Sequence, residues 1–174
     1  ADGVKVTENG KAAPELKDIF QLVKDYDAVL ATAHISPEEC FVVCEAARAA
    51  GVKKLVVTHP EWWVVGMSLE DQKRIVKDYD VLLERCYAQN MGGGKYKSNL
   101  PENLEVIREI GYEHVLISTD GGQTENPHWE IAMQNYLQYL SDNGIPDEQI
   151  YHMSHTTAAK LLGIFLCIVI LFQK

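Results

Sequence analysis

The sequence has no excess of basic residues that would suit a nucleic-acid partner. It contains 16 lysines and arginines against 25 aspartates and glutamates, and its formal net charge at pH 7 is -9. Binding to a phosphate backbone relies on a basic patch whose contacts release counterions. We therefore expect no nucleic acid among the partners, and small molecules, metal ions or other proteins remain.

The sequence also has no apolar run long enough to span a membrane. Residues 161–172 read LLGIFLCIVILF, which falls well short of the roughly 20 residues that a membrane-spanning helix needs. We therefore expect no membrane span, and this run remains open as a buried strand or helix, a subunit contact or an aggregation-prone end. The N-terminus shows no basic region followed by an apolar core, so no signal peptide is expected.

Cysteine is scarce and shows no paired spacing. The four cysteines, Cys40, Cys44, Cys86 and Cys167, form no Cys-x-x-Cys motif and do not match the framework of a small disulfide-stapled secreted domain. We therefore expect a reducing compartment and a cytoplasmic location. Cys40 and Cys44 stand four apart on a predicted helix and could share a metal ion, but two thiols on an apolar face are more often core residues, and we interpret them in this way.

Strand-like and helix-like patterns alternate along the 174 residues, 47% of which are hydrophobic. After a short strand or hairpin at the N-terminus, we predict strands near residues 28–34, 54–59, 81–87 and 114–119, with helices between and after them and two short final helices at 146–153 and 156–162. At least four such units predict an α/β fold with a parallel sheet and right-handed crossovers. A barrel and an open doubly wound sheet both satisfy this pattern, but no glycine-rich dinucleotide fingerprint follows the first strand.

Three of the predicted strands end in residues that can carry chemistry. His34, His59 and Asp120 each follow an apolar run. Taken singly, a packed core histidine or an Asp-Gly turn explains each of them. Because the C-terminal ends of parallel strands meet at one mouth, their recurrence instead predicts a metal site, with zinc, or else manganese or iron, as the ion.

Four further residues are candidates for a substrate pocket at this mouth. Trp62 and Trp63 follow His59 and either wall the pocket or cover the rim, while His128 lies close enough after Asp120 to reach the mouth. Lys95 stands in a glycine-rich, basic segment, residues 90–98, which we interpret as a mobile mouth loop with anion binding as the alternative.

Several phrases resemble the amidohydrolase superfamily of metal-dependent hydrolases, and most closely an uncharacterised amidohydrolase-like family within it. These phrases are ATAHISPEE, KKLVVTHPEW, HVLISTDGGQ with NPH, and MSHTTAAKLLG. The resemblance implies a (β/α)8 TIM barrel in which His34 ends the fifth strand, His59 the sixth and Asp120 the eighth. It also implies that the histidines bind a divalent ion, and that Asp120 binds it and takes a proton from the attacking water during cleavage of an amide, ester, lactone or phosphoester bond in a small molecule.

The sequence departs from this family in two ways. It has no His-x-His pair, and 174 residues are too few for a barrel of about 250. We therefore expect residues 1–163 to be the C-terminal part of a barrel, with about five strands, and residues 164–174 to be an apolar tail. A second copy or another chain would supply the missing strands; the alternative is a non-catalytic, truncated or degenerate barrel that acts as a binding or assembly subunit.

The residues lining this partial barrel leave some roles open. Lys5 or Glu8 could supply a fourth-strand ligand, although solvent-facing strand residues explain them better. Glu84 and Tyr87, on the strand before Asp120, could face the interior as wall or as functional groups. His114 begins its strand, so we expect it at the opposite end of the sheet from the metal site.

Overall fold

A four-stranded parallel sheet forms the centre of the molecule. The computed structural model describes residues 4–164. The strands of the sheet, in spatial order, are β3 (Val29–Ala31), β4 (Lys54–Val57), β5 (Leu82–Cys86) and β8 (Val115–Ser118). Each neighbouring pair is parallel. The predicted α/β class and parallel sheet are therefore confirmed.

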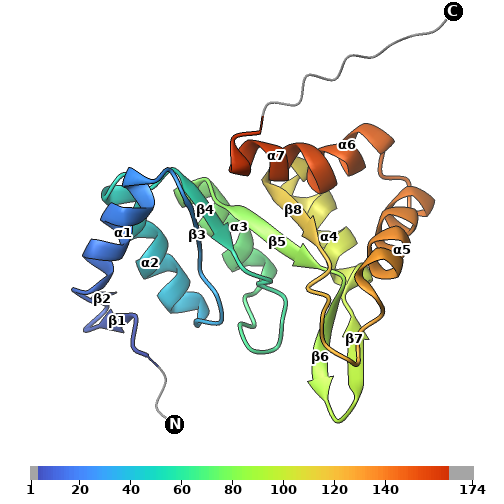
Figure 1. The fold of residues 1–174 in the computed structure, drawn as a ribbon, viewed down its shortest axis with the longest axis horizontal. Coiled ribbons are helices and arrows are strands. Elements are labelled where there is room, and N and C mark those ends of the chain that lie inside the picture. Colours follow the sequence, from blue (N-terminus) through green and yellow to red (C-terminus); the bar gives the residue numbers. More distant parts are fainter. Residues whose placement is uncertain (1–3, 165–174) are drawn as a thin grey trace, which may run out of the picture.

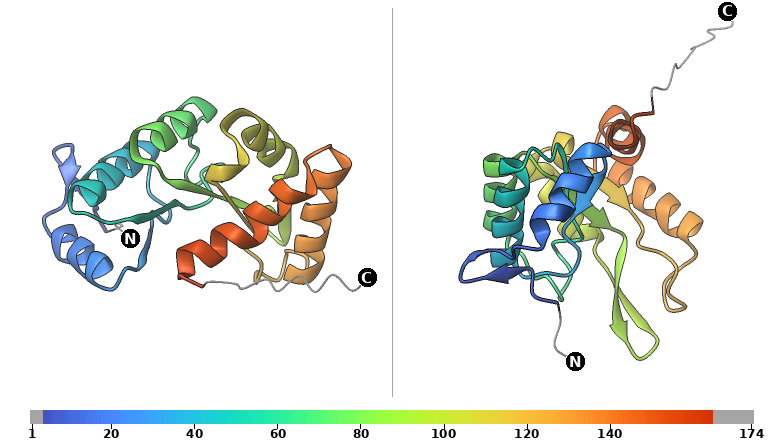
Figure 2. Two further views of the ribbon diagram at one scale, coloured as in Figure 1. Left: turned by 90° about the horizontal axis from the view of Figure 1, so that it is seen from above. Right: turned by 60° about the vertical axis from the view of Figure 1, so that its left-hand side comes forward.

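Helices connect these strands and cover one face of the sheet. The connecting helices are α2 (Pro37–Ala49), α3 (Leu69–Tyr79) and α4 (Leu100–Ile110), while α1 (Leu16–Asp25) precedes the first strand of the sheet and α5 (Trp129–Asp142) follows the last. The left view of Figure 2 shows α2, α3 and α4 in an arc along the strands. Alternate strand residues, including Leu55, Val57 and Leu83, are buried in the core on this side, as the period-2 alternation of a strand requires.

The opposite face of the sheet is more open. Leu82, Glu84, Leu116 and Ser118 are only half-buried, and Ala31 is exposed. Within residues 4–164, β3 pairs only with β4, and β8 pairs only with β5, so both edges of the sheet are free of further strands. Parallel sheets are normally covered on both faces. The described residues thus form an open sheet rather than a closed barrel.

We expected about five strands in the parallel sheet, whereas the structure shows four. The N-terminal strand β1 (Thr7–Glu8) pairs antiparallel with β2 (Lys11–Ala12) and forms the hairpin that was the other N-terminal expectation. Asn9 and Gly10 have φ values of 52° and 73°, the left-handed pair of a tight hairpin turn. This turn folds β1 back onto the next residues, so it joins no neighbour in the parallel sheet.

The glycine-rich segment that we expected as a loop is a second antiparallel hairpin. Its strands are β6 (Ala88–Gly92) and β7 (Lys95–Ser98). Gly92, Gly93 and Gly94 all have positive φ, which lets the chain reverse tightly. Figure 1 shows the hairpin projecting beyond the sheet at the end where the strands finish. Its strands are short and polar, so hydrophobic alternation could not reveal them.

A helical run crosses the other end of the sheet. It consists of α6 (Asp147–Tyr151), the π-helical turn η2 (His152–Thr156) and α7 (Thr157–Leu162), in place of the two separate helices expected here. A short 3-10 turn, η1 (Tyr112–His114), precedes β8. Figure 1 places α6 and α7 opposite the β6–β7 hairpin. Most of the predicted apolar tail, from residue 165 onward, lies outside the described residues.

The buried cysteines behave as core residues. Cys40 and Cys44 on α2 have no exposed surface and carry free thiols, as predicted. Burial raises the pKa of Cys40 to about 11 and that of Cys44 to about 12, so neither is a thiolate at neutral pH. Cys167 lies outside the described residues. Within residues 4–164, no helix has the length and apolar character needed to cross a bilayer.

Candidate functional site

Two histidines meet where neighbouring strands end. His34 follows β3, and His59 follows β4. Their Nε2 atoms are 2.9 Å apart, and their ring centroids are separated by 4.7 Å. Since β3 and β4 are parallel neighbours, the same end of the sheet carries both imidazoles. The structure therefore brings together two of the three predicted metal ligands.

Two threonines fasten these strand ends to each other. The hydroxyl of Thr32 accepts a hydrogen bond from the Thr58 amide at 3.1 Å, and the hydroxyl of Thr58 accepts one from the Ala33 amide at 3.1 Å. The Thr32 amide also donates to the Val56 carbonyl at 3.0 Å. This reciprocal contact continues the β3–β4 pairing beyond the strands and fixes the residues that precede each histidine.

The backbone is strained at all three strand ends that carry predicted ligands. Ala33, next to His34, has a φ of 54°, His59 a φ of 23° and Asp120 a φ of 46°. Positive φ is uncommon for residues other than glycine, and such outliers cluster at functional sites, where the surrounding structure holds them. The three outliers occur at equivalent positions of a repeated strand-to-loop junction.

Trp62 shields the ring of His59 from water, whereas His34 remains exposed. Its ring stacks on His59 with centroids 4.3 Å apart and lies 6.4 Å from the ring of His34. His59 is 2% exposed and Trp62 6%. Burial lowers the pKa of His59, and the neighbouring His34 lowers it further, while Asp120 has the opposite effect. His59 is consequently neutral at pH 7, the form that can bind a metal ion.

The pair fits part of a metal site. Two nitrogens bound to zinc at the usual length and tetrahedral angle lie about 3.3 Å apart, so the Nε2 atoms need to separate only slightly. The buried Nδ1 of His59 has no hydrogen-bond partner among the described residues. If Nε2 binds the metal ion, the N–H at Nδ1 is left to donate a hydrogen bond to a water or to another supporting group. However, within residues 4–164 no three His, Cys, Asp or Glu side chains are grouped so that they could hold one ion together.

Asp120 lies at the same end of the sheet but on a strand that is not adjacent to the histidine strands. It follows β8, and β5 lies between β8 and β4. The loop that it opens is held by the Asn126 side-chain amide, which donates to the Asp120 carbonyl oxygen at 3.4 Å and to Gln123 at 2.6 Å. The sheet therefore places Asp120 at the same end as the histidines, while the described residues do not place it in one cluster with both imidazoles.

The four predicted pocket residues occupy different surroundings. Trp62 is buried against the histidines, whereas Trp63 is 65% exposed and its indole donates to the Asn90 carbonyl at 3.1 Å, which ties its loop to the β6–β7 hairpin. Lys95 is exposed at the start of β7. His128 lines a cavity of about 580 Å³, together with Thr119 and other residues of the loop between β8 and α5 but without Asp120.

A buried polar network behind the site was not predicted from the sequence. Arg85 on β5 has no exposed surface. Its guanidinium donates to Asn103 at 2.9 Å and to Gln72 at 2.8 Å, and it forms an ion pair with Glu61 at 3.2 Å. The signal in the sequence was an arginine beside Glu84 in a short strand, which alone does not identify its partners.

Glu84 points to the open face of the sheet, the side on which it was expected. The hydroxyl of Ser118 donates to its carboxylate at 2.9 Å and lies 3.2 Å from the Cys86 sulfur. Tyr87, in contrast, is buried and packs near Tyr136 in the core with α4 and α5, so it does not face the open side of the sheet. Lys5 and Glu8 lie by the N-terminal hairpin and line a separate cavity there.

Replacing Glu84 by glutamine should stabilise the protein at neutral pH but not in acid. Burial raises the pKa of Glu84, and the nearby Asp120 raises it further. A raised pKa means that the folded state favours the protonated carboxyl. The protein is therefore more stable below the pKa that Glu84 has in the unfolded chain, and it loses this extra stability as the pH rises through the pKa of the folded state. We expect Glu84→Gln to gain up to about 1 kcal/mol in urea unfolding at pH 8 and nothing at pH 4. An equal change in the free energy of unfolding at pH 8 and pH 4 would contradict this prediction.

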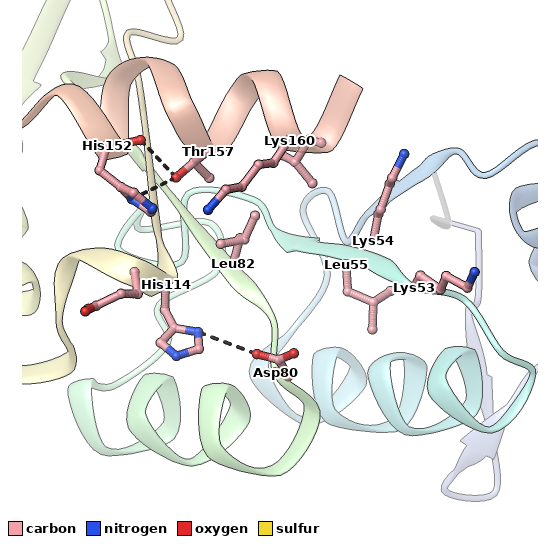
Figure 3. Close-up of a pocket in the computed structure, with 11 residues that line it drawn as sticks. Lys53, Lys54, Leu55, Asp80, Leu82, His114, His152, Thr157 and Lys160 are labelled. Atoms are coloured by element: carbon pink, nitrogen blue, oxygen red, sulfur yellow. Dashed lines mark hydrogen bonds and ion pairs between the residues drawn. The ribbon is translucent and has the colours of Figure 1, made fainter. Parts of the chain in front are cut away.

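Another cavity, of about 380 Å³, lies at the opposite end of the sheet (Figure 3). It is lined by the beginnings of β4 and β5 and by α7. Two of its ionisable side chains already have partners: Lys54 contacts Asp27 at 2.8 Å, and His114 lies 3.8 Å from Asp80. His114 lines this cavity, which confirms its predicted position away from the histidine pair. Ligands of α/β sheets usually bind at the C-terminal ends of the strands, so we place the candidate site there.

Comparison with known proteins adds one sequence match. Residues 1–84 match a family of unknown function (DUF6282). The matched part contains both His34 and His59 but stops before Asp120. No curated protein and no solved structure matches the chain.

Proposed function

We propose that this chain is part of a metal-dependent hydrolase of the amidohydrolase type. The observation that carries this proposal is the 2.9 Å contact between the Nε2 atoms of His34 and His59, made at neighbouring strand ends whose backbone is strained. Catalytic metal sites in barrels are built from such strand ends, and the phrases around both histidines resemble that superfamily.

Each residue of the site has a distinct role in this proposal. His34 and His59 are the nitrogen ligands of a divalent ion, zinc in the first place and manganese or iron as alternatives. Such an ion lowers the pKa of a water from near 16 toward ~7 and polarises the scissile bond. Asp120 is the third ligand and accepts the proton of the attacking water at its carboxylate. Trp62 stacks on His59 and keeps bulk water from that ring, so that His59 remains neutral.

The substrate is a small molecule with an amide, ester, lactone or phosphoester bond. The remaining ligands would come from strands outside residues 4–164. The free edges of β3 and β8 and the half-exposed face between them suit a further set of parallel strands from a second copy or another chain. The proposed enzyme is therefore the completed barrel.

The open sheet also favours a second candidate function. A half-exposed face and two unpaired edges are features of a surface that binds another chain, and no three-ligand group is present in residues 4–164. On these grounds the chain would be a binding or assembly subunit without turnover. The two candidates differ in their need for metal.

Metal titration of the purified full-length chain tests the proposal. We expect stoichiometric binding of zinc, manganese or iron, and a loss of at least about tenfold in zinc affinity for His34→Ala and for His59→Ala, because each removes a nitrogen ligand. His114→Ala, at the opposite end of the sheet, is the control and should bind zinc unchanged. Calorimetry with zinc chloride measures both stoichiometry and affinity. Absence of stoichiometric metal, or an equal loss for His114→Ala, would favour the binding subunit.

A further inference from the structure

We infer that Glu61 is a positioning residue that holds the ring of His59 against that of His34. The inference rests on the metal-binding role proposed above for these histidines. Glu61 touches neither ring; it acts through the turn that joins β4 to α3, which begins at His59 and ends near Met67.

The backbone of this turn is strained at its first residue, His59. His59 has a φ of 23°, a value that costs of the order of 1–3 kcal/mol and persists only where the surroundings enforce it. Backbone hydrogen bonds close the turn, from the Trp62 amide to the His59 carbonyl at 3.0 Å and from the Met67 amide to the Pro60 carbonyl at 2.9 Å. These bonds shape the turn but do not attach it to the sheet.

The Glu61 side chain makes that attachment. Its Oε1 accepts a hydrogen bond from the Cys86 backbone amide at 3.1 Å and another from the Asn99 side chain at 3.3 Å. Its Oε2 is 3.2 Å from the Arg85 guanidinium, and the side chain is only 5% exposed. The Glu61 carboxylate thus connects the turn after His59 to Cys86 at the end of β5 and to Asn99, which precedes α4.

The far end of the turn is held by the same network. Arg85 donates to Oε1 of Gln72, whose Nε2 donates to the Met67 carbonyl at 2.9 Å. Both ends of the turn are therefore tied to one buried arginine. A movement of the turn away from the end of β5 strains the contacts of Glu61 and Gln72, together with those of Trp63 to the β6–β7 hairpin.

The energetics favour a positioning role over a purely stabilising one. Burial raises the pKa of Glu61, and the Arg85 charge opposes this rise. A buried ion pair is often no more stabilising than apolar residues of similar volume. What a leucine at this position could not provide is the acceptor for the Cys86 amide, and this bond fixes the turn relative to β5.

Three variants separate positioning from stability. Glu61→Gln keeps an acceptor for the Cys86 amide but loses the charge. The pair Glu61→Leu with Arg85→Met removes the acceptor without leaving a charge buried and unpaired. Arg48→Met is the control, because Arg48 donates to the Tyr79, Val52, Lys53 and Asp80 carbonyls at the opposite end of the sheet. All three should unfold at lower urea concentrations than the unmodified chain.

The readouts are zinc affinity and the contact between the histidine rings in the metal-free chain. We expect the Leu/Met pair to bind zinc 10–100 times more weakly, the usual effect of losing an outer support of a metal ligand. Glu61→Gln and Arg48→Met should keep the affinity of the unmodified chain. The nuclear Overhauser contact between the His34 and His59 rings, whose centroids are 4.7 Å apart, should vanish only in the Leu/Met pair.

These readouts also distinguish two kinds of failure. If the unmodified chain binds no zinc, the proposed function fails, and the ring contact alone decides the role of Glu61. If the ring contact survives in the Leu/Met pair, Glu61 does not position His59. If Arg48→Met loses the contact as well, its loss reflects general loosening, and the inference is equally overturned.

Discussion

Replacing Asp120 by asparagine is expected to slow hydrolysis by the completed, metal-loaded protein by about 10²–10⁴-fold, the usual contribution of a general base. Asparagine has nearly the same size and cannot take a proton from water. It also tolerates the left-handed backbone that Asp120 adopts, with a φ of 46°. The folded structure should therefore survive the change while the rate falls.

Asp80→Asn is a closely matched control for this experiment. Asp80 also has a left-handed backbone, with a φ of 48°, but it lies at the opposite end of the sheet, beside His114. Rates would be measured on chromogenic esters, a lactone, an anilide and a phosphoester, with zinc supplied to each protein. Asp80→Asn should match the unmodified chain. A full rate for Asp120→Asn, or an equal loss for Asp80→Asn, would remove Asp120 from the reaction.

Local chemistry made much of the fold predictable. The start of α2 follows from Ser36, Pro37 and Glu39, and the structure shows the capping box that this spacing predicts, with Ser36 accepting from the Glu39 amide at 3.3 Å. The contact between His34 and His59 follows from two similar strand endings and from the rule that parallel strands finish at one edge. Each inference needed only a few neighbouring residues and one rule of topology.

Other features depend on partners that are distant in the sequence. The parallel sheet omits β1 because an Asn-Gly turn satisfied its backbone locally, and the β6–β7 hairpin forms from polar residues without apolar alternation. The contact between Glu61 and Arg85 joins residues that no periodicity relates. Likewise, the positive φ of Asp120 and the distance of its strand from the histidine strands are set by the whole sheet. The sequence could predict which residues reach the mouth, but not how closely they approach one another.

Replacing Arg85 by methionine is expected to cost about 3–5 kcal/mol of folding free energy. The guanidinium is fully buried and contacts Glu61, Gln72 and Asn103. Without it, the carboxylate of Glu61 stays buried with no counter-charge, and the two amide side chains each lose a hydrogen-bonding partner. Urea unfolding followed by far-UV circular dichroism measures the loss. Arg74→Met, at an arginine that is largely exposed on α3, should cost less than about 1 kcal/mol.

Adding Glu61→Leu to Arg85→Met is expected to recover part of this loss. The second substitution removes the unpaired buried charge, and replacing both members of a buried pair by apolar side chains is often close to neutral. The recovery should be incomplete, because Gln72 and Asn103 still lack the donors that Arg85 supplied. The double variant should therefore unfold between Arg85→Met and the unmodified chain. If the two substitutions cost as much together as the sum of each alone, the Glu61–Arg85 contact contributes no coupling, and the network does not act as one unit behind the histidine pair.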